Sequence, residues 1–187
     1  MSPFGKHKIT TSPTPQVDQE RLERERVVEL RGPLDDEQAK DLIAKLLFLQ
    51  YKDQRLPITL LIDSPGGSVA AGMAVIDTVK YLEPPVHTRC ISNAHGMAAI
   101  ILGAGQRGER SVVFGSAVSL TPLLYAESDT ATDAELEQKM VKRLLLAGAI
   151  ATCSGREINS VIQDLTAGRH FDAAGAIEYG LADRMVD

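Results

Sequence analysis

The chain has 187 residues, of which 44% are hydrophobic, and this size and composition fit one globular domain with a buried core. A formal net charge of -5 argues against nucleic acid or an anionic membrane as the main partner, and an aromatic content of 4% argues against stacking on bases. No apolar run approaches the roughly 20 residues that span a bilayer, and no secretory signal opens the chain, so we expect a cytoplasmic protein.

The first half of the chain alternates predicted strands and helices after a polar start. Residues 1–19 contain many Pro, Ser and Thr and predict a flexible N-terminal arm, followed by a single domain over residues 20–187. A helix capped by Asp35 or Asp36 carries its apolar residues on one face. The other predicted elements of this half are a solvated helical turn over residues 18–26, strands over 27–30, 58–62 and 86–92, and helices over 69–82 and 96–102.

The second half is dominated by helical patterns. Thr132 to Glu135 form a capping-box pattern that opens the longest helical stretch, and Gly155 ends it after Cys153. Strands that alternate with helices predict an α/β domain with mainly parallel pairing. The remaining predicted elements are strands over 111–114, 117–121 and 184–186 and helices over 157–165 and 172–179.

The stretch from Leu60 to Met73 is the centre of this pattern. An apolar strand ends at Pro65, the pair Gly66 and Gly67 permits backbone angles closed to other residues, and a helical pattern follows. Such a turn lines up backbone N–H groups beside a helix N-terminus, where an anion, a carbonyl oxygen or an oxyanion can bind. A tight strand-to-helix turn without chemistry is the commoner explanation of Pro-Gly-Gly alone.

A second glycine-rich segment, Gly103 to Gly108, matches the GxGxxG pattern of dinucleotide-binding turns, with an acid further on at Glu127. In dinucleotide-binding folds this pattern leaves a strand and opens a helix. Here it leaves an Ala-rich helical stretch and enters the strand-like residues 110–114. The order of elements therefore predicts a turn that ends a helix, and we expect no cofactor.

Few side chains suit metal binding or nucleophilic catalysis. None of the histidines has a metal-ligand partner at i+4 or a nearby carboxylate cluster, so no metal site is predicted. His95 precedes Gly96 at a predicted strand-to-helix junction, where a nucleophile elbow would lie, but no GxSxG motif occurs. His170 is expected near the end of a loop. Cys90 and Cys153 lie in apolar surroundings and predict buried thiols.

Four segments of the chain together carry a resemblance to a known family: Asp63–Val69 with Ala71–Ala74, Leu46–Gln50, Ala104–Arg110 and Ala176–Asp183. They resemble segments of the proteolytic subunit of the Clp protease (ClpP), in the same order along the chain. The resemblance implies a ClpP/crotonase-like α/β fold with mainly parallel sheets and a protruding helical handle at about residues 132–153. It also implies heptameric rings, usually two stacked through their handles, that work with an AAA+ unfoldase.

The catalytic residues of the family do not carry over to this chain. The serine nucleophile falls on Gly96, the histidine on Thr121 and the aspartate on Gly168. Loss of the hydroxyl removes covalent catalysis, and loss of the base and of the acid that orients it removes any simple rescue by water. The chain is therefore expected to be an inactive ClpP-like paralogue of the ClpR type, with a structural or regulatory role.

The resemblance further implies an oxyanion hole made by backbone N–H groups of Gly66, Gly67 and Met97. These groups are retained and are expected to serve the fold or to hold a peptide by backbone hydrogen bonds.

Departures from the family pattern also concern assembly. Residues 123–128 replace the family's glycine-rich substrate strand, and Thr166-Ala167 replace its ring-to-ring Asp-Arg pair. Residues 58–61 lack the aromatics of its unfoldase docking pocket. A homo-oligomeric ring and a mixed ring with an active ClpP subunit both remain open.

An active enzyme with a relocated site is the alternative. Related crotonase-fold peptidases use a Ser/Lys dyad, and another activity of that fold, such as acyl-CoA chemistry, is a more distant option. A solvated helix face is the simpler explanation of the lysines. The candidates are Ser68, Ser92 and Ser119 near the old site and Lys139 and Lys142 on the handle.

Overall fold

The computed structural model describes residues 19–120 and 132–187. The predicted N-terminal arm lies outside these residues except for Gln19, and so do Thr121, the segment 123–128 and Glu127. Among the described residues, no helix has the length and apolar character needed to cross a membrane.

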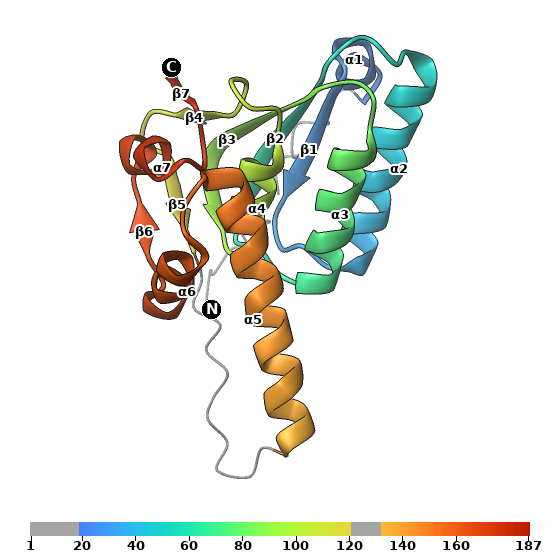
Figure 1. Ribbon diagram of the computed structural model, residues 1–187. Helices are drawn as coiled ribbons and strands as arrows, with labels where there is room; N and C mark the ends of the chain where they lie inside the picture. Colours follow the sequence, from blue (N-terminus) through green and yellow to red (C-terminus); the bar gives the residue numbers. More distant parts are fainter. Residues whose placement is uncertain (1–18, 121–131) are drawn as a thin grey trace, which may run out of the picture.

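A seven-stranded sheet forms the centre of the fold (Figure 1). Its strands are β1 (Val27–Arg31), β2 (Ile58–Ser64), β3 (Val86–His95), β4 (Ser111–Val113), β5 (Ala117–Ser119), β6 (His170–Phe171) and β7 (Arg184–Val186). The main path has the order β1-β2-β3-β4-β7, and each neighbouring pair on it is parallel. The first part of β3 pairs with β4 and its last part pairs in parallel with β5, which is antiparallel to β6. The predicted mainly parallel α/β fold is confirmed.

Seven helices accompany the sheet in the described residues. They are α1 (Gln19–Glu25), α2 (Asp36–Lys52), α3 (Val69–Tyr81), α4 (Met97–Ala104), α5 (Asp133–Ser154), α6 (Ile158–Ala167) and α7 (Ala173–Tyr179). The helices α2 and α3 pack side by side, α4 packs on β3, and α5 extends well beyond the sheet (Figure 1). The helix α5 opens with the predicted capping box at Thr132 and ends at Gly155, which has the left-handed conformation.

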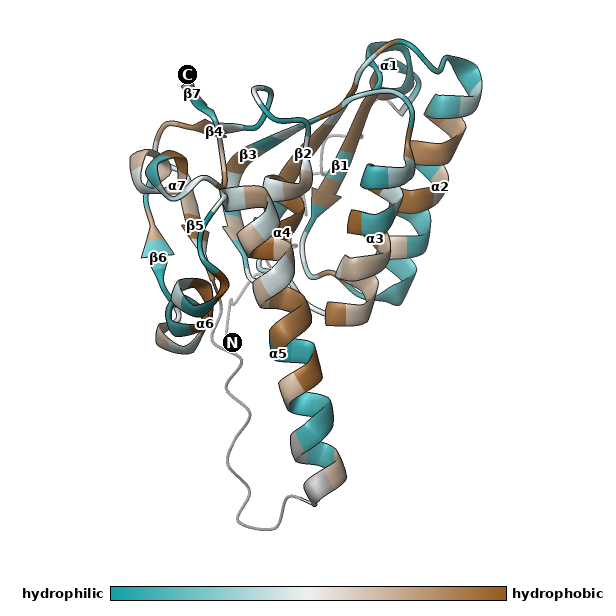
Figure 2. Cartoon of the chain, viewed as in Figure 1, coloured by the Kyte–Doolittle hydropathy of each residue, from teal (hydrophilic) through white to brown (hydrophobic). Residues whose placement is uncertain are grey.

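The core lies between the sheet and these helices. Along β2 the burial alternates strictly, and Ile58, Leu60 and Ile62 are 0% exposed. Apolar residues dominate β1, β2 and α4, whereas α5 carries alternating polar and apolar bands along its projecting part (Figure 2). Burying these side chains removes apolar surface from water, which stabilises the fold by about 25 cal/mol per Å² of surface. The core therefore holds the ends of β2 and β3 in a fixed relation.

Two details differ from the sequence-based expectations. The strand β3 runs on to His95 instead of ending at Ser92, because its polar end still finds pairing partners in β2 and β5. His170 lies on the short strand β6, not in a loop.

The GxGxxG segment behaves as predicted. Gly103 is inside α4, which ends at Ala104, and the chain then turns into β4. The segment leaves a helix and enters a strand, which is the reverse of the order in a dinucleotide-binding turn.

Candidate functional site

The first part of the site is the turn between β2 and α3. Gly66 has φ 82° and Gly67 has φ 153°, conformations that L side chains rarely adopt. The turn is bonded to Leu34: the Leu34 N–H donates to the Gly66 carbonyl and the Ser68 N–H donates to the Leu34 carbonyl, both at 2.8 Å. A Cβ on Gly67 would lie 2.1 Å from the Leu34 carbonyl oxygen, so this position has no room for a side chain.

The second part is the sharp turn between β3 and α4. Gly96 lies between the last residue of β3 and the first of α4, with φ 53° and ψ -118°. This is a strained strand-to-helix turn of the kind that exposes a nucleophile in hydrolases. The Gly96 N–H donates to the Ser119 carbonyl at 2.9 Å, and the Gly96 carbonyl accepts from the Ala99 N–H at 3.1 Å. The elbow geometry is thus present with glycine at its apex.

The two turns are in direct contact. A Cβ on Gly66 would lie 2.4 Å from the His95 carbonyl oxygen and 3.2 Å from the Met97 nitrogen. The side chain of Met97 packs on Gly72 of α3, where an added Cβ would come within 2.4 Å of the Met97 methyl carbon. The absence of side chains at Gly66 and Gly72 therefore lets the two backbone segments approach each other.

The contacts of the backbone N–H groups distinguish the three predicted oxyanion-hole residues. The Gly66 N–H donates to Ser64 Oγ at 3.0 Å, and Ser64 Oγ donates to the Gly32 carbonyl at 2.6 Å. Within residues 19–120 and 132–187, the Gly67 and Met97 N–H groups donate to no atom. The turn therefore leaves these two donors available to a carbonyl oxygen or an anion.

The family model of the Clp protease matches residues 14–187, which is most of the chain. The chain belongs to the Clp protease family. The mostly parallel sheet and the helices around it agree with the Clp protease fold. The projecting α5 lies where the resemblance places the family's handle, and it covers Asp133–Ser154 against the predicted 132–153.

The resemblance assigns the catalytic triad to Gly96, Thr121 and Gly168, of which the structure describes the two glycines. Gly96 is at the elbow, while Thr121 lies outside the described residues. Gly168 is the C-cap of α6, with φ 62° and ψ 51°, and its N–H donates to the Asp164 carbonyl. Neither glycine offers a group that can attack a carbonyl carbon or orient an imidazole. Glycine is common where a helix ends in the left-handed conformation, so the cap position alone explains the glycine at position 168 and no catalytic role is needed.

A polar contact beside the elbow was not predicted from the sequence. Ser119 Oγ and His95 Nδ1 lie 2.8 Å apart, and Ser119 is 3% exposed. The two residues are direct partners in the parallel pairing of β3 with β5. Both had been singled out separately, but they are 24 positions apart in the sequence, and only the register of the strands brings them together.

The candidate serines of a relocated site take part in local contacts. Ser68 Oγ caps α3 by accepting from the Ala71 N–H, and Ser92 Oγ accepts from the Asn93 side-chain amide. Among the described residues, no hydrogen bond joins Lys142 to Ser68, Ser92 or Ser119.

The thiols are also unsuited to nucleophilic chemistry. Cys90 is buried as predicted, but Cys153 near the end of α5 is only partly buried. Burial raises the pKa of both thiols, so both are protonated at neutral pH.

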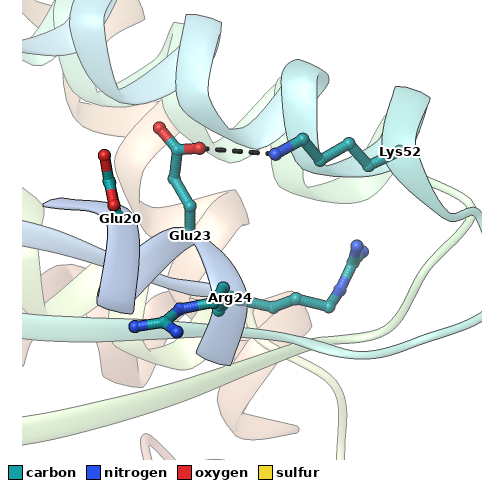
Figure 3. A pocket seen from close by; sticks show the side chains of 5 residues that line it. Glu20, Glu23, Arg24 and Lys52 are labelled. Atoms are coloured by element: carbon teal, nitrogen blue, oxygen red, sulfur yellow. Dashed lines mark hydrogen bonds and ion pairs between the residues drawn. The ribbon is translucent and has the colours of Figure 1, made fainter.

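A surface depression of about 440 Å³ lies elsewhere, beside α1 and the end of α2 (Figure 3). Two of its charges form an ion pair, with Glu23 Oε2 3.4 Å from Lys52 Nζ, and the Arg26 guanidinium donates to the carbonyls of Leu49 and Asp53 at 2.9 Å each. The bonds from Arg26 satisfy carbonyl groups at the C-terminal end of α2, and none of the lining side chains is a nucleophile. The residues that line the depression are Glu20, Glu23, Arg24, Arg26 and Lys52.

Proposed function

We propose that this chain is a ring-forming subunit of a Clp protease-type assembly that does not itself hydrolyse peptide bonds. The observation that carries the proposal is the elbow at Gly96, which keeps the φ and ψ of a nucleophile turn without a nucleophilic side chain. Because peptide hydrolysis by this family mechanism begins with attack by a hydroxyl, a glycine at the apex ends it at the first step.

The other two triad positions support the same conclusion. Thr121 stands where a histidine would accept the nucleophile's proton, and a threonine hydroxyl has no such basicity at neutral pH. Gly168 has no carboxylate to orient an imidazole. Restoring one of the three groups would therefore not restore the sequence of proton transfers, because the three groups act as a unit.

A structural role in a ring agrees with what the chain retains. The Gly67 and Met97 N–H groups donate to no atom of the described residues, so the subunit can hold a peptide by backbone hydrogen bonds without cutting it. We propose the cytoplasm as its compartment and an AAA+ unfoldase as a partner of the assembly. The ring consists of copies of this chain or of this chain with an active ClpP subunit.

The projecting part of α5 supports assembly through the handle. It carries four large apolar side chains in the open: Met140 is 65% exposed, Val141 51%, Leu144 45% and Leu145 52%. Between these apolar residues in the sequence, Arg143 donates to Thr166 on α6, which joins the helix to the body. A rigid helix with an apolar stripe of this kind is stabilised when a second helix covers it. We propose the handle of a facing subunit as that partner.

Hydrolysis and assembly are tested in one sample. The purified chain is incubated with a fluorogenic peptide and with an unfolded protein, and its mass in solution is measured in parallel. A ring-sized particle without turnover is the expected result. Turnover that survives repurification, and that is also seen in the folded fraction of a Gly67→Ala preparation, would overturn the proposal. It would mean that a working nucleophile lies outside the elbow.

The handle is tested with a matched pair of variants. Met140→Glu with Leu144→Glu places two charges on the apolar stripe and is expected to halve the mass of a stacked assembly. Glu137→Gln changes an exposed residue of the same helix and is expected to leave the mass unchanged. Equal masses for the unmodified chain and both variants would overturn the proposed contact between handles. They would not affect the proposal that the catalytic triad is missing.

A further inference from the structure

The strongest unassigned chemistry in the described residues is the contact between Ser119 and His95. The hydroxyl oxygen and the imidazole Nδ1 are 2.8 Å apart, within the range of a proton-transferring hydrogen bond. No other hydrogen bond of Ser119 Oγ occurs in the part of the chain that the structure describes. The imidazole is therefore the one described group that can take up the hydroxyl proton.

Strand pairing fixes this contact. Ser119 lies between two histidines in the sheet: it pairs with His95 in parallel across β3 and β5 and with His170 in antiparallel fashion across β5 and β6. Residues paired in this way point to the same face of a sheet, with Cβ atoms about 4.5–5.5 Å apart in the antiparallel case. The Ser119 carbonyl also accepts the Gly96 N–H, so the serine is fastened to the elbow itself.

We propose that Ser119, with His95 as its base, is a nucleophile that accepts acyl groups from small activated esters. Oγ forms a bond to the carbonyl carbon while its proton moves to Nδ1 of His95. The bond from that carbon to the leaving oxygen breaks, and the alcohol departs with the proton from His95. The products are an acylated Ser119 and one alcohol.

Burial selects the class of reactant. Ser119 is 3% exposed, so attack by Oγ on any carbonyl carbon requires local opening of the end of β5, and a small ester needs a smaller opening than a polypeptide does. Among the described residues no carboxylate forms a hydrogen bond with His95, so the imidazole lacks the partner that orients it for fast turnover. The acyl group is therefore retained, and the reaction stops near one equivalent per chain.

The proposal is independent of the absence of peptidase activity, because acylation by a small ester requires neither the elbow nucleophile nor polypeptide access. The full-length chain is treated with a fluorophosphonate, and separately with p-nitrophenyl acetate. The expected results are one covalent adduct mapped to Ser119 and a release of nitrophenol close to one equivalent.

Matched variants identify the base. His95→Gln keeps a hydrogen-bonding group beside Ser119 but removes the proton acceptor, and it is expected to slow labelling by roughly a hundredfold. His170→Ala removes the neighbouring imidazole, and Ser92→Ala removes a nearby hydroxyl. Both are expected to label at the rate of the unmodified chain.

A measurement on the unmodified chain guards against variants that fail to fold. Peptide mapping of the unmodified chain after fluorophosphonate treatment is expected to place the adduct on Ser119. An adduct on another residue, no adduct at all, or an unchanged rate in folded His95→Gln would each overturn the proposal. None of these outcomes bears on ring assembly or on the missing triad.

Discussion

Arg110 and Asp183 form an ion pair 73 positions apart in the sequence, with 2.6 Å between Nη2 and Oδ1. Arg110 is 4% exposed, and its Nη1 also donates to the carbonyls of Gly103, Cys153 and Gly180. These carbonyls lie at the C-terminal ends of α4, α5 and α7. One guanidinium thus satisfies three helix ends and a carboxylate, and it joins the base of the projecting helix to the sheet.

Replacing Arg110 is expected to destabilise the fold strongly. Arg110→Met removes the guanidinium from Asp183 and from three carbonyls, while the backbone N–H groups of Gly108 and Arg110 still donate to Asp183 Oδ2. A loss of about 3–5 kcal/mol in the free energy of unfolding is expected, measured by urea titration. Arg184→Met is the control, because its ion pair with Glu109 is exposed and contributes at most about 1 kcal/mol. Equal losses in the two variants would contradict the role given to Arg110.

The same ion pair makes stability depend on pH. Burial by itself raises the pKa of Asp183, but hydrogen bonds from Arg110 and its charge outweigh burial, and the net pKa is lowered. A carboxyl whose pKa is lower in the folded state than in the unfolded state stabilises the fold above the unfolded value, about 3.9 for Asp, and this contribution is lost as the pH falls through the folded value. The melting temperature is therefore expected to fall in acid, and Asp183→Asn to flatten this fall. If the melting temperature depends on pH in the same way in both proteins, Asp183 is ruled out as a source of the pH dependence.

The contact between the two turns is tested by a pair of glycines with the same φ of 82°, Gly66 and Gly115. An added Cβ meets the His95 carbonyl oxygen at 2.4 Å in Gly66→Ala but nothing within 4 Å in Gly115→Ala. Gly115→Ala is expected to cost about 1–2 kcal/mol for the left-handed backbone. Gly66→Ala is expected to cost about 1–3 kcal/mol more, because the Cβ forces the two turns apart. The free energy of unfolding of both variants is measured by urea titration. Equal losses in Gly66→Ala and Gly115→Ala would mean that the two turns can move apart without an energetic cost.

A serine at position 96 is expected to have a strained backbone and no catalytic activity. Gly96→Ser places a side chain at φ 53° and ψ -118°, which costs about 1–3 kcal/mol. It supplies a hydroxyl, but positions 121 and 168 still lack a base and an acid, so no hydrolysis of a fluorogenic peptide is expected. Gly155→Ser, at φ 74° with nothing within 4 Å, is the control for the cost of a positive φ. Turnover in Gly96→Ser alone would show that another base reaches the elbow.

Local features of the fold were predictable because they depend on neighbouring residues. The capping box at Thr132 and the left-handed end at Gly155 depend on side chains and φ values within one or two turns of helix. The order of elements around Gly103, a helix followed by a strand, was also predictable. The strand β6 was missed because two residues carry no periodic pattern, and only its pairing with β5 makes them a strand.

The sequence by itself determined the family, the α/β class and the loss of side chains at Gly96 and Gly168, because motifs and residue types are properties of the linear chain. The tertiary structure decided which distant groups meet. Strand register places Ser119 beside His95, and the packing of three helix ends places Arg110 on Asp183. Contacts of this kind follow from hydrogen-bond pairing and close packing across the whole core, which no local stretch of sequence encodes.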